Sequence, residues 1–265
     1  MHITSVKLIY FSPTGTTKKV LENIAEPLKI DSVEHLDLTL PEENIHRFNI
    51  LDDVLSIIGV PVYGGRVPVE AIPRIQRLKS NNTPAVIVVV YGNREYDDAL
   101  LELYNITTEL GFNTIAAGAF LGEHQILRIA RGRPDIKDLK KAQTFGKKIF
   151  SKLQNITYIE GVSPLEIPGN YPYIELPSAK DLLEVCPTTK EEQCIKCSTC
   201  IEVCPTAAIS LDDTVITNTD TCVLCFACIK NCPTQARIID TPLLSKYVEY
   251  ANNNFAKRKE PEIFL

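Results

Sequence analysis

The sequence predicts an α/β chain in two parts: a doubly wound parallel sheet of five strands in the order 2-1-3-4-5, followed by a small α+β unit. Two observations carry this prediction. Up to residue 153 the chain alternates short apolar segments with helical stretches, which is typical of a parallel sheet covered by helices. All nine cysteines lie further on, between Cys186 and Cys232, so the smaller unit has a chemistry of its own.

Each strand of the predicted sheet is an apolar segment that ends in a turn or at the start of a helix. We expect the five strands at Val6–Phe11, Val33–Leu38, Val54–Val60, Ala85–Tyr91 and Asn113–Phe120. We expect helices after Thr17 through about Leu28, after Pro68 to Leu78, at Asp97–Leu110 and at Asp138–Leu153. Strands and helices that alternate in this way favour parallel crossover connections.

The boundaries follow from changes in composition. The sheet domain is expected at residues 1–158 and the cysteine-bearing domain at residues 191–241. Residues 159–190 lack clear periodicity and are rich in proline, which is typical of an extended linker or strap. One helical turn is expected there at Asp181–Val185. Residues 242–265 are expected to form a C-terminal helix, roughly Pro242–Lys257, and a tail, with the helix packed back on one of the domains.

Charge and apolar content suggest the compartment and the kind of partner. No apolar run reaches membrane-spanning length, and Met1–Tyr10 lacks a signal pattern, so we expect a cytoplasmic protein without a membrane partner. Residues 181–240 hold nine acidic and four basic side chains, and 4 − 9 = −5 equals the formal charge of the whole chain. Such an acidic face attracts basic redox proteins and repels nucleic acid, although solubility alone would also explain it.

The cysteines form an internal repeat at an offset of 28 residues, in which each copy reads C-x₂-C-x₂-C-x₃-C-P. Soft thiolates at this spacing suit [4Fe–4S] clusters, and in this pattern the fourth cysteine ligates the other cluster. One cluster is therefore assigned to Cys194, Cys197, Cys200 and Cys232, and the second to Cys222, Cys225, Cys228 and Cys204. Zinc is the alternative, but its sites usually separate two C-x₂-C pairs by a longer loop. Cys186 has no partner motif, and we interpret it as an incidental thiol. The segment resembles bacterial two-cluster ferredoxins.

The loop after the first strand has a phosphate-binding pattern. Ser12-x-Thr14-Gly15-x-Thr17 opens a helix, whose free backbone N–H groups can hold a phosphate. The G-x-x-x-x-G-K-[ST] and G-x-G-x-x-G patterns are both absent, which argues against a triphosphate P-loop and a dinucleotide fingerprint. A helix cap rich in Ser and Thr would look similar. The loop resembles the phosphate loop of flavodoxins, which bind FMN.

Two further loops lie at the carboxyl ends of predicted strands, where doubly wound folds bind ligands. They resemble the flavodoxin loops that flank the flavin ring. By this resemblance Ser12, Thr14, Gly15, Thr16 and Thr17 hold the FMN phosphate; Tyr63, Gly64 and Gly65 lie along the ring; and Gly92, Asn93 and Tyr96 complete the pocket. His124 follows the fifth strand at the same end and is either a flavin or linker contact or a hydrogen-bonded structural histidine.

Taken together, the chain resembles the flavodoxin–ferredoxin fusion proteins of anaerobic bacteria and archaea. The resemblance implies a flavodoxin-like domain with FMN and a ferredoxin domain with two [4Fe–4S] clusters, and it implies electron transfer to protein redox partners. The alternative is an FMN-dependent oxidoreductase that reduces a flavin, quinone or nitro compound with cluster-supplied electrons. No residue is assigned a catalytic role, and the sequence leaves a homodimer open.

Overall fold

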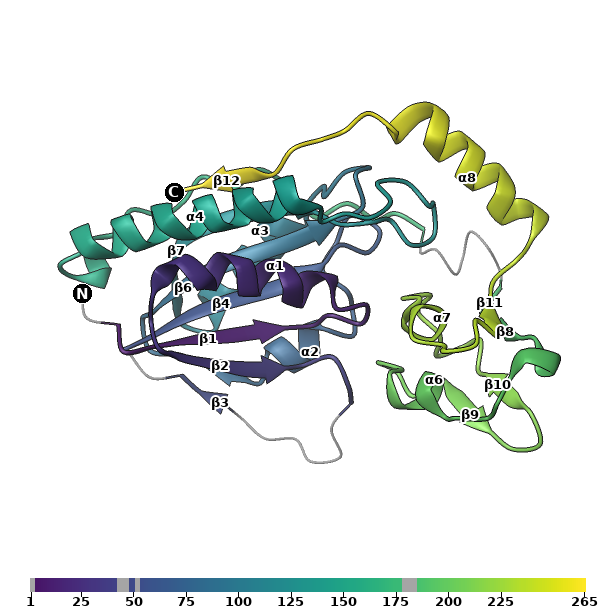
Figure 1. The fold of residues 1–265 in the computed structure, drawn as a ribbon. Helices are drawn as coiled ribbons and strands as arrows, with labels where there is room; N and C mark the ends of the chain where they lie inside the picture. Colours follow the sequence, from purple (N-terminus) through teal and green to yellow (C-terminus); the bar gives the residue numbers. More distant parts are fainter. Residues whose placement is uncertain (1–2, 42–47, 51–52, 178–184) are drawn as a thin grey trace.

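The fold comes from a computed structural model, which describes residues 3–41, 48–50, 53–177 and 185–265. Its larger part is a six-stranded sheet in the order β12-β7-β6-β4-β1-β2, with helices on both faces (Figure 1). In this sheet β2, β1, β4, β6 and β7 are mutually parallel and lie in the predicted order 2-1-3-4-5. Strand β12 joins the edge antiparallel to β7. The predicted doubly wound fold is therefore confirmed, with a sixth strand added by the C-terminus.

The parallel strands follow the predicted segments closely. They are β1 (Ser5–Tyr10), β2 (Ser32–Asp37), β4 (Val54–Pro61), β6 (Thr83–Tyr91) and β7 (Phe112–Leu121). Every residue of β6 is buried, as a central strand of a parallel sheet requires when both of its faces are covered. The edge strand β2 is mostly exposed.

Helices α1 (Thr16–Ala25) and α4 (Ile136–Asn155) pack together on one face of the sheet. Helix α3 (Ala99–Glu109) and the short α2 (Ile72–Ile75) cover the other face. Gly146 lets α4 approach α1 closely, because a side chain there would meet the backbone carbonyl of Ile24. None of the helices in the described residues is long and apolar enough to cross a membrane.

The helix expected up to Leu78 is much shorter than predicted. It ends at Ile75, and Leu78–Lys79 form the strand β5, which pairs with β3 (Phe48–Asn49). Leu78 is buried there, so strand pairing and burial outweigh the helical signal of this stretch.

The proline-rich segment is docked along the larger domain. The carboxylate of Asp98 accepts hydrogen bonds from the backbone N–H groups of Asn170 (2.7 Å) and Ile174 (2.6 Å). The ring of Tyr173 lies 4.6 Å from the guanidinium of Arg66, which itself pairs with the buried Glu102. The helical turn expected at Asp181–Val185 lies largely outside the described residues.

The smaller unit reproduces the sequence repeat in its backbone. Helices α6 (Thr199–Glu202) and α7 (Ala227–Lys230) occupy equivalent places, and each is followed by a strand. These strands are β9 (Ile209–Leu211), which pairs with β10 (Val215–Thr217), and β11 (Arg237–Ile238), which pairs with β8 (Thr188–Thr189). Since β8 precedes residue 191, the unit begins earlier in the chain than the predicted boundary.

After this unit the chain returns to the larger domain (Figure 1). Helix α8 (Pro242–Phe255) is capped by the Thr241 hydroxyl and packs through Leu244 against Leu224 and Phe226. Strand β12 (Glu262–Phe264) then pairs with β7. The helix therefore packs on the smaller unit, as one of the predicted alternatives had it, and the tail belongs to the sheet.

A buried ion pair anchors this return. The carboxylate of Asp138 accepts from Arg133 (2.5 and 2.8 Å), from the backbone N–H of Asp135 (2.9 Å) and from Arg258 of the tail (2.9 Å). The side chains of Asp138 and Arg133 are only 2% and 5% exposed, so removal of the carboxylate would leave a buried, unpaired guanidinium.

We expect Asp138→Ala to lower the free energy of unfolding by about 3–5 kcal/mol, because it breaks this pair from one side. The matched change Lys141→Ala removes the exposed Lys141–Glu260 pair (2.6 Å) and should cost less than about 1 kcal/mol. Urea unfolding followed by far-UV circular dichroism measures both. Equal losses in the two variants would contradict the anchoring role.

Candidate functional site

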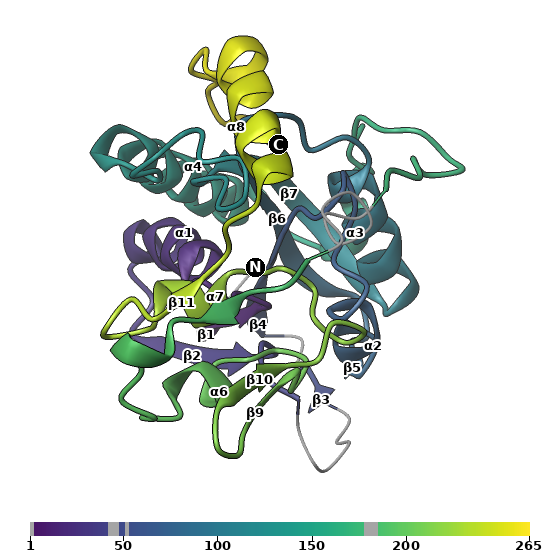
Figure 2. The ribbon, with the colours of Figure 1, turned by 90° about the vertical axis from the view of Figure 1, so that its right-hand side faces the viewer.

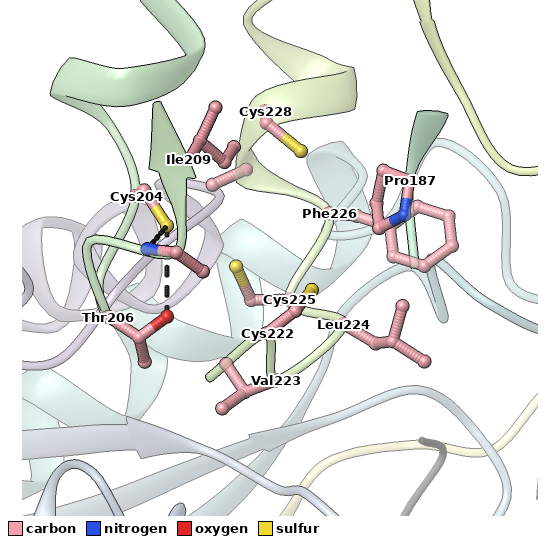
Figure 3. Close-up of a pocket in the computed structure, with 12 residues that line it drawn as sticks. Pro187, Cys204, Thr206, Ile209, Cys222, Val223, Leu224, Cys225, Phe226 and Cys228 are labelled. Carbon is pink, nitrogen blue, oxygen red and sulfur yellow. Dashed lines mark hydrogen bonds between the residues drawn. The ribbon is translucent and has the colours of Figure 1, made fainter. Parts of the chain in front are cut away.

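The eight repeat cysteines line two cavities in the smaller unit. One, the Cys225 cavity, is lined by Cys204, Cys222, Cys225 and Cys228 (Figure 3). The other, the Cys197 cavity, is lined by Cys194, Cys197, Cys200 and Cys232. The structure thus brings together the same two sets of four that the sequence analysis assigned, each with one cysteine from the other repeat.

Backbone strain accompanies both cavities. Lys196 and Ser198 have positive φ (54° and 61°), and so do their repeat equivalents Leu224 and Phe226 (51° and 64°). Non-glycine residues adopt this conformation at a cost of order 1 kcal/mol each, and such strain concentrates at ligand clamps. It turns successive N–H groups toward one side, a geometry that suits anionic groups such as iron–sulfur clusters.

Donors already point at some of the sulfurs. The backbone N–H of Ala208 donates to Cys204 Sγ (3.2 Å), and the hydroxyl of Thr206 lies 3.7 Å from the same sulfur (Figure 3). In the other cavity the Cys197 thiol donates to the Thr199 hydroxyl (3.4 Å), and this hydroxyl becomes the donor when the sulfur is a thiolate. Donors of this kind stabilise negative charge on sulfur.

The two cavities differ in exposure. Burial raises the pKa of Cys225 to about 12, so this thiol would ionise readily only with a cation at the site. Cys197 is exposed, and a hydrogen bond from Thr199 lowers its pKa. At these two positions the Cys197 cavity is thus the more exposed of the two.

The donor set fits an iron–sulfur cluster. Among the described residues no three His, Cys, Asp or Glu side chains are gathered closely enough to hold a single metal ion. The thiols stand instead around the walls of two cavities, and soft thiolates with N–H donors are the usual surroundings of such clusters. Cys186 lies outside both cavities, with its Sγ 3.9 Å from the carbonyl oxygen of Thr217.

The predicted phosphate loop lies between β1 and α1. Gly15 (φ 75°) is the N-cap residue of α1, and the Ser12 hydroxyl accepts from the N–H of Lys18 (3.1 Å). The hydroxyls of Thr14 and Thr16 lie 3.2 Å apart. Within the described residues the backbone N–H groups of Thr16 and Thr17 have no hydrogen-bond acceptor, so the loop fits an anion. The side chain of Thr17 is buried.

The second predicted loop is a tight turn from Tyr63 to Arg66. Gly64 and Gly65 both have positive φ (57° and 79°), and a side chain on Gly65 would lie 2.5 Å from the carboxylate of Asp97. Gly64 is exposed and Tyr63 is half-buried. The pKa of Tyr63 is raised, first by burial and then by negative charge at Cys225.

The third predicted loop is partly occupied by the C-terminal tail. Asn93 is buried, and its amide donates to the carbonyls of Phe255 (2.6 Å) and Lys257 (2.9 Å). The hydroxyl of Tyr96 donates to Glu262 (2.8 Å). Both side chains therefore form hydrogen bonds with the tail. Gly92 lies against His124, where a side chain would collide with the imidazole.

The smaller unit sits at the carboxyl end of the parallel strands (Figures 1 and 2). The ammonium of Lys230, at the end of α7, donates to the carbonyl of Thr14 in the phosphate loop (2.8 Å). Arg74 donates to the carbonyl of Pro205 (2.6 Å), and Ile126 packs against Leu224 and Phe226. Sequence reasoning missed Lys230, because nothing local to its repeat indicates which loop it reaches.

Comparison with known proteins agrees for the smaller unit. The family described as "4Fe-4S dicluster domain" matches residues 193–236. No curated protein matches the chain. With the flavodoxin-like strand order observed above, the match confirms the predicted combination of a flavodoxin-like α/β domain and an iron–sulfur domain.

Several solved structures are similar to the larger domain. A flavodoxin from the domain Archaea is 15% identical over 57% of this chain and 99% of its own, with a TM-score of 0.39. A Fusobacterium nucleatum flavodoxin bound to flavin mononucleotide is 14% identical over 56% and 98%, with a TM-score of 0.40. Rubredoxin oxygen:oxidoreductase from Desulfovibrio gigas is 15% identical over 58% of this chain and 37% of its own, with a TM-score of 0.42.

His124 makes the stability of the protein sensitive to mild acid. Burial, with a smaller contribution from Arg94, lowers its pKa from 6.5 to about 4, and its Nδ1 accepts from the N–H of Leu127 (3.3 Å). The folded state therefore holds a neutral ring, whereas the unfolded chain takes up a proton below about pH 6.5. Stability contributed by the neutral ring is complete above pH 6.5 and is lost as the pH falls toward 4.

Between pH 7 and pH 5 we expect this one group to remove about 2 kcal/mol from the free energy of unfolding. His124→Gln should be less stable at pH 7 but should lose less between these two pH values. Urea titrations of both proteins at each pH measure the difference. Identical losses in the two proteins would contradict a buried, neutral His124.

Proposed function

We propose that this chain is an electron-transfer protein that relays electrons between FMN, held at the carboxyl end of the parallel sheet, and two [4Fe–4S] clusters in the cysteine cavities. The observation that carries the proposal is the docking of α7 on the phosphate loop, where Lys230 reaches Thr14. It brings the Cys225 cavity beside the proposed flavin site within one chain. We further propose that the protein acts in the cytoplasm and serves protein redox partners.

The cysteine sets support two clusters. Each cavity offers four thiols, three from one repeat and the fourth from the other. The N–H of Ala208 and the hydroxyls of Thr199 and Thr206 would stabilise negative charge on the ligating sulfurs. A bound metal would deprotonate the thiols, including the half-buried Cys225.

The phosphate loop supports FMN. Ser12, Thr14 and Gly15 shape the loop, and the N–H groups of Thr16 and Thr17 would hold the phosphate. The turn at Tyr63–Arg66 would line the ring through the exposed Gly64 and the half-buried Tyr63. The tail contacts occupy the amide nitrogen of Asn93 and the hydroxyl of Tyr96, so these two polar groups would not serve the ring. FMN, when bound, exchanges one or two electrons, whereas each cluster exchanges one.

The surface near the Cys197 cavity supports exchange with a partner. Cys197 is exposed, and near it in the sequence lie the exposed, apolar Ile195 and four exposed charged side chains, Lys190, Glu191, Glu192 and Lys196. Exposed apolar and charged side chains together are available for contact with a partner protein. The cluster in the Cys225 cavity would then pass electrons between the flavin and the cluster in the Cys197 cavity. Sustained reduction of a small acceptor by the purified chain alone would favour the oxidoreductase alternative.

Iron content tests the cluster assignment. Anaerobically purified protein is expected to hold about eight irons per chain. Cys225→Ser should lower the content to about four, because it removes one ligand of one cluster. The matched change Cys186→Ser should leave the content unchanged, since Cys186 lies outside both cavities. Colorimetric iron and sulfide assays measure this, and a normal content in Cys225→Ser would contradict the assignment.

Flavin affinity tests the phosphate loop and Lys230 together. We expect Lys230→Gln to weaken FMN binding by tenfold or more, because the positive charge beside the phosphate is lost. Riboflavin, which has no phosphate, should bind both proteins equally. Lys147→Gln, on the exposed face of α4, is the matched control. Flavin fluorescence quenching on addition to apoprotein measures each affinity, and an equal loss for FMN and riboflavin would overturn the phosphate role.

A further inference from the structure

The two repeats differ at one buried position beside the sulfurs. At the offset of 28 residues, Ile209 in the first repeat corresponds to Arg237 in the second, and each begins the strand that follows its short helix. Both side chains are nearly inaccessible, with exposed fractions of 6% and 2%. The second repeat therefore buries a permanent positive charge where the first buries an apolar side chain.

The guanidinium of Arg237 lies between the two cavities. Its Nη1 donates to the Thr189 hydroxyl (2.6 Å), and its Nη2 donates to the carbonyl of Pro187 (2.9 Å) and the Thr217 hydroxyl (2.5 Å). The side chain lines the Cys197 cavity, and its Nη2 also lies 3.9 Å from the Sγ of Cys228 in the Cys225 cavity. One cation thus borders both sets of thiols.

One donor of this side chain has no acceptor. The Nε of Arg237 is buried without a hydrogen-bond partner, and the guanidinium forms no ion pair with a carboxylate of the described residues. An unpaired charge and an unsatisfied N–H are both costly in a protein interior. A negatively charged group that fills the Cys197 cavity would satisfy both.

We infer that Arg237 tunes the two clusters: its Nε–H donates to a sulfur of the cluster in the Cys197 cavity, and its charge raises the reduction potentials of both clusters. The inference rests on the proposed function, since it needs clusters in both cavities. Reduction adds one negative charge to a cluster, so a buried cation stabilises the reduced form, as does a hydrogen bond to sulfur. Arg237 is a positioning and tuning residue, and we assign it no bond-making step.

The test is a redox titration of the intact chain, followed by electron paramagnetic resonance under anaerobic conditions. Arg237→Met removes the charge at similar length and should shift both midpoints to more negative potentials. We expect at least a tenfold change in each one-electron reduction equilibrium, which corresponds to about 59 mV. Lys190→Met is the matched control, since this exposed lysine of the same unit is screened by solvent and should shift neither midpoint.

Arg237→Lys separates the two parts of the inference. The ammonium keeps the charge but lacks the Nε–H, and it also loses the longer Nη2 contact with Cys228 (3.9 Å), so the cluster of the Cys197 cavity should shift further to negative potential than the other cluster. The same variant decides the question if Arg237→Met fails to assemble. Potentials unchanged from the wild type in Arg237→Lys would overturn the hydrogen bond, and unchanged potentials in an assembled Arg237→Met would overturn the whole inference.

Iron and sulfide content of the wild-type protein is measured first. Protein without two clusters would contradict the proposed function itself, whereas two clusters that ignore Arg237 would contradict only this inference. The two failures are therefore distinguishable.

Discussion

The structure depends above all on how the cysteine-bearing unit is seated against the carboxyl end of the parallel sheet. Groups that exchange electrons must lie close together, and a covalent connection alone only raises their local concentration. Here the seating is specific: Lys230 bonds to the phosphate loop, Arg74 bonds to Pro205, and Leu224 packs with Ile126. These two polar contacts and one apolar contact together set the orientation of the smaller unit on the larger domain.

The C-terminal segment also holds the smaller unit against the larger domain. Helix α8 packs on the smaller unit, and β12 joins the sheet of the larger one, so the chain connects the two units twice. Between these elements the tail satisfies the buried amide of Asn93 and brings Arg258 to the buried carboxylate of Asp138. Because these polar groups are buried, release of the tail would leave them unsatisfied at considerable cost.

The two cysteine repeats share a backbone conformation but differ in charge at two corresponding positions. Positive φ values recur at the same offset, which shows that the same turn is built twice. At the end of the short helix, however, Glu202 stands where the second repeat has Lys230, and Ile209 stands where it has Arg237. The second repeat thus carries one cation toward the sheet and another between the cavities, whereas the first repeat faces solvent with acidic side chains. The two repeats therefore share one backbone conformation but carry different charges at these two positions.

Local patterns were sufficient for much of this molecule. The apolar strands, the helices between them and the cysteine spacing depend on neighbours within a few residues, so sequence reasoning predicted the parallel order and the two groups of thiols that line the cavities. The docking of Lys230 on Thr14, the capture of Asn93 and Tyr96 by the tail, and the unpaired Nε of Arg237 depend on segments that meet only after folding. The early end of helix α2 also depends on such a contact. Leu78–Lys79, where a helix was expected, form the strand β5, and its partner strand β3 lies far away in sequence. Contacts of this kind are decided by packing and burial, and no local pattern records them.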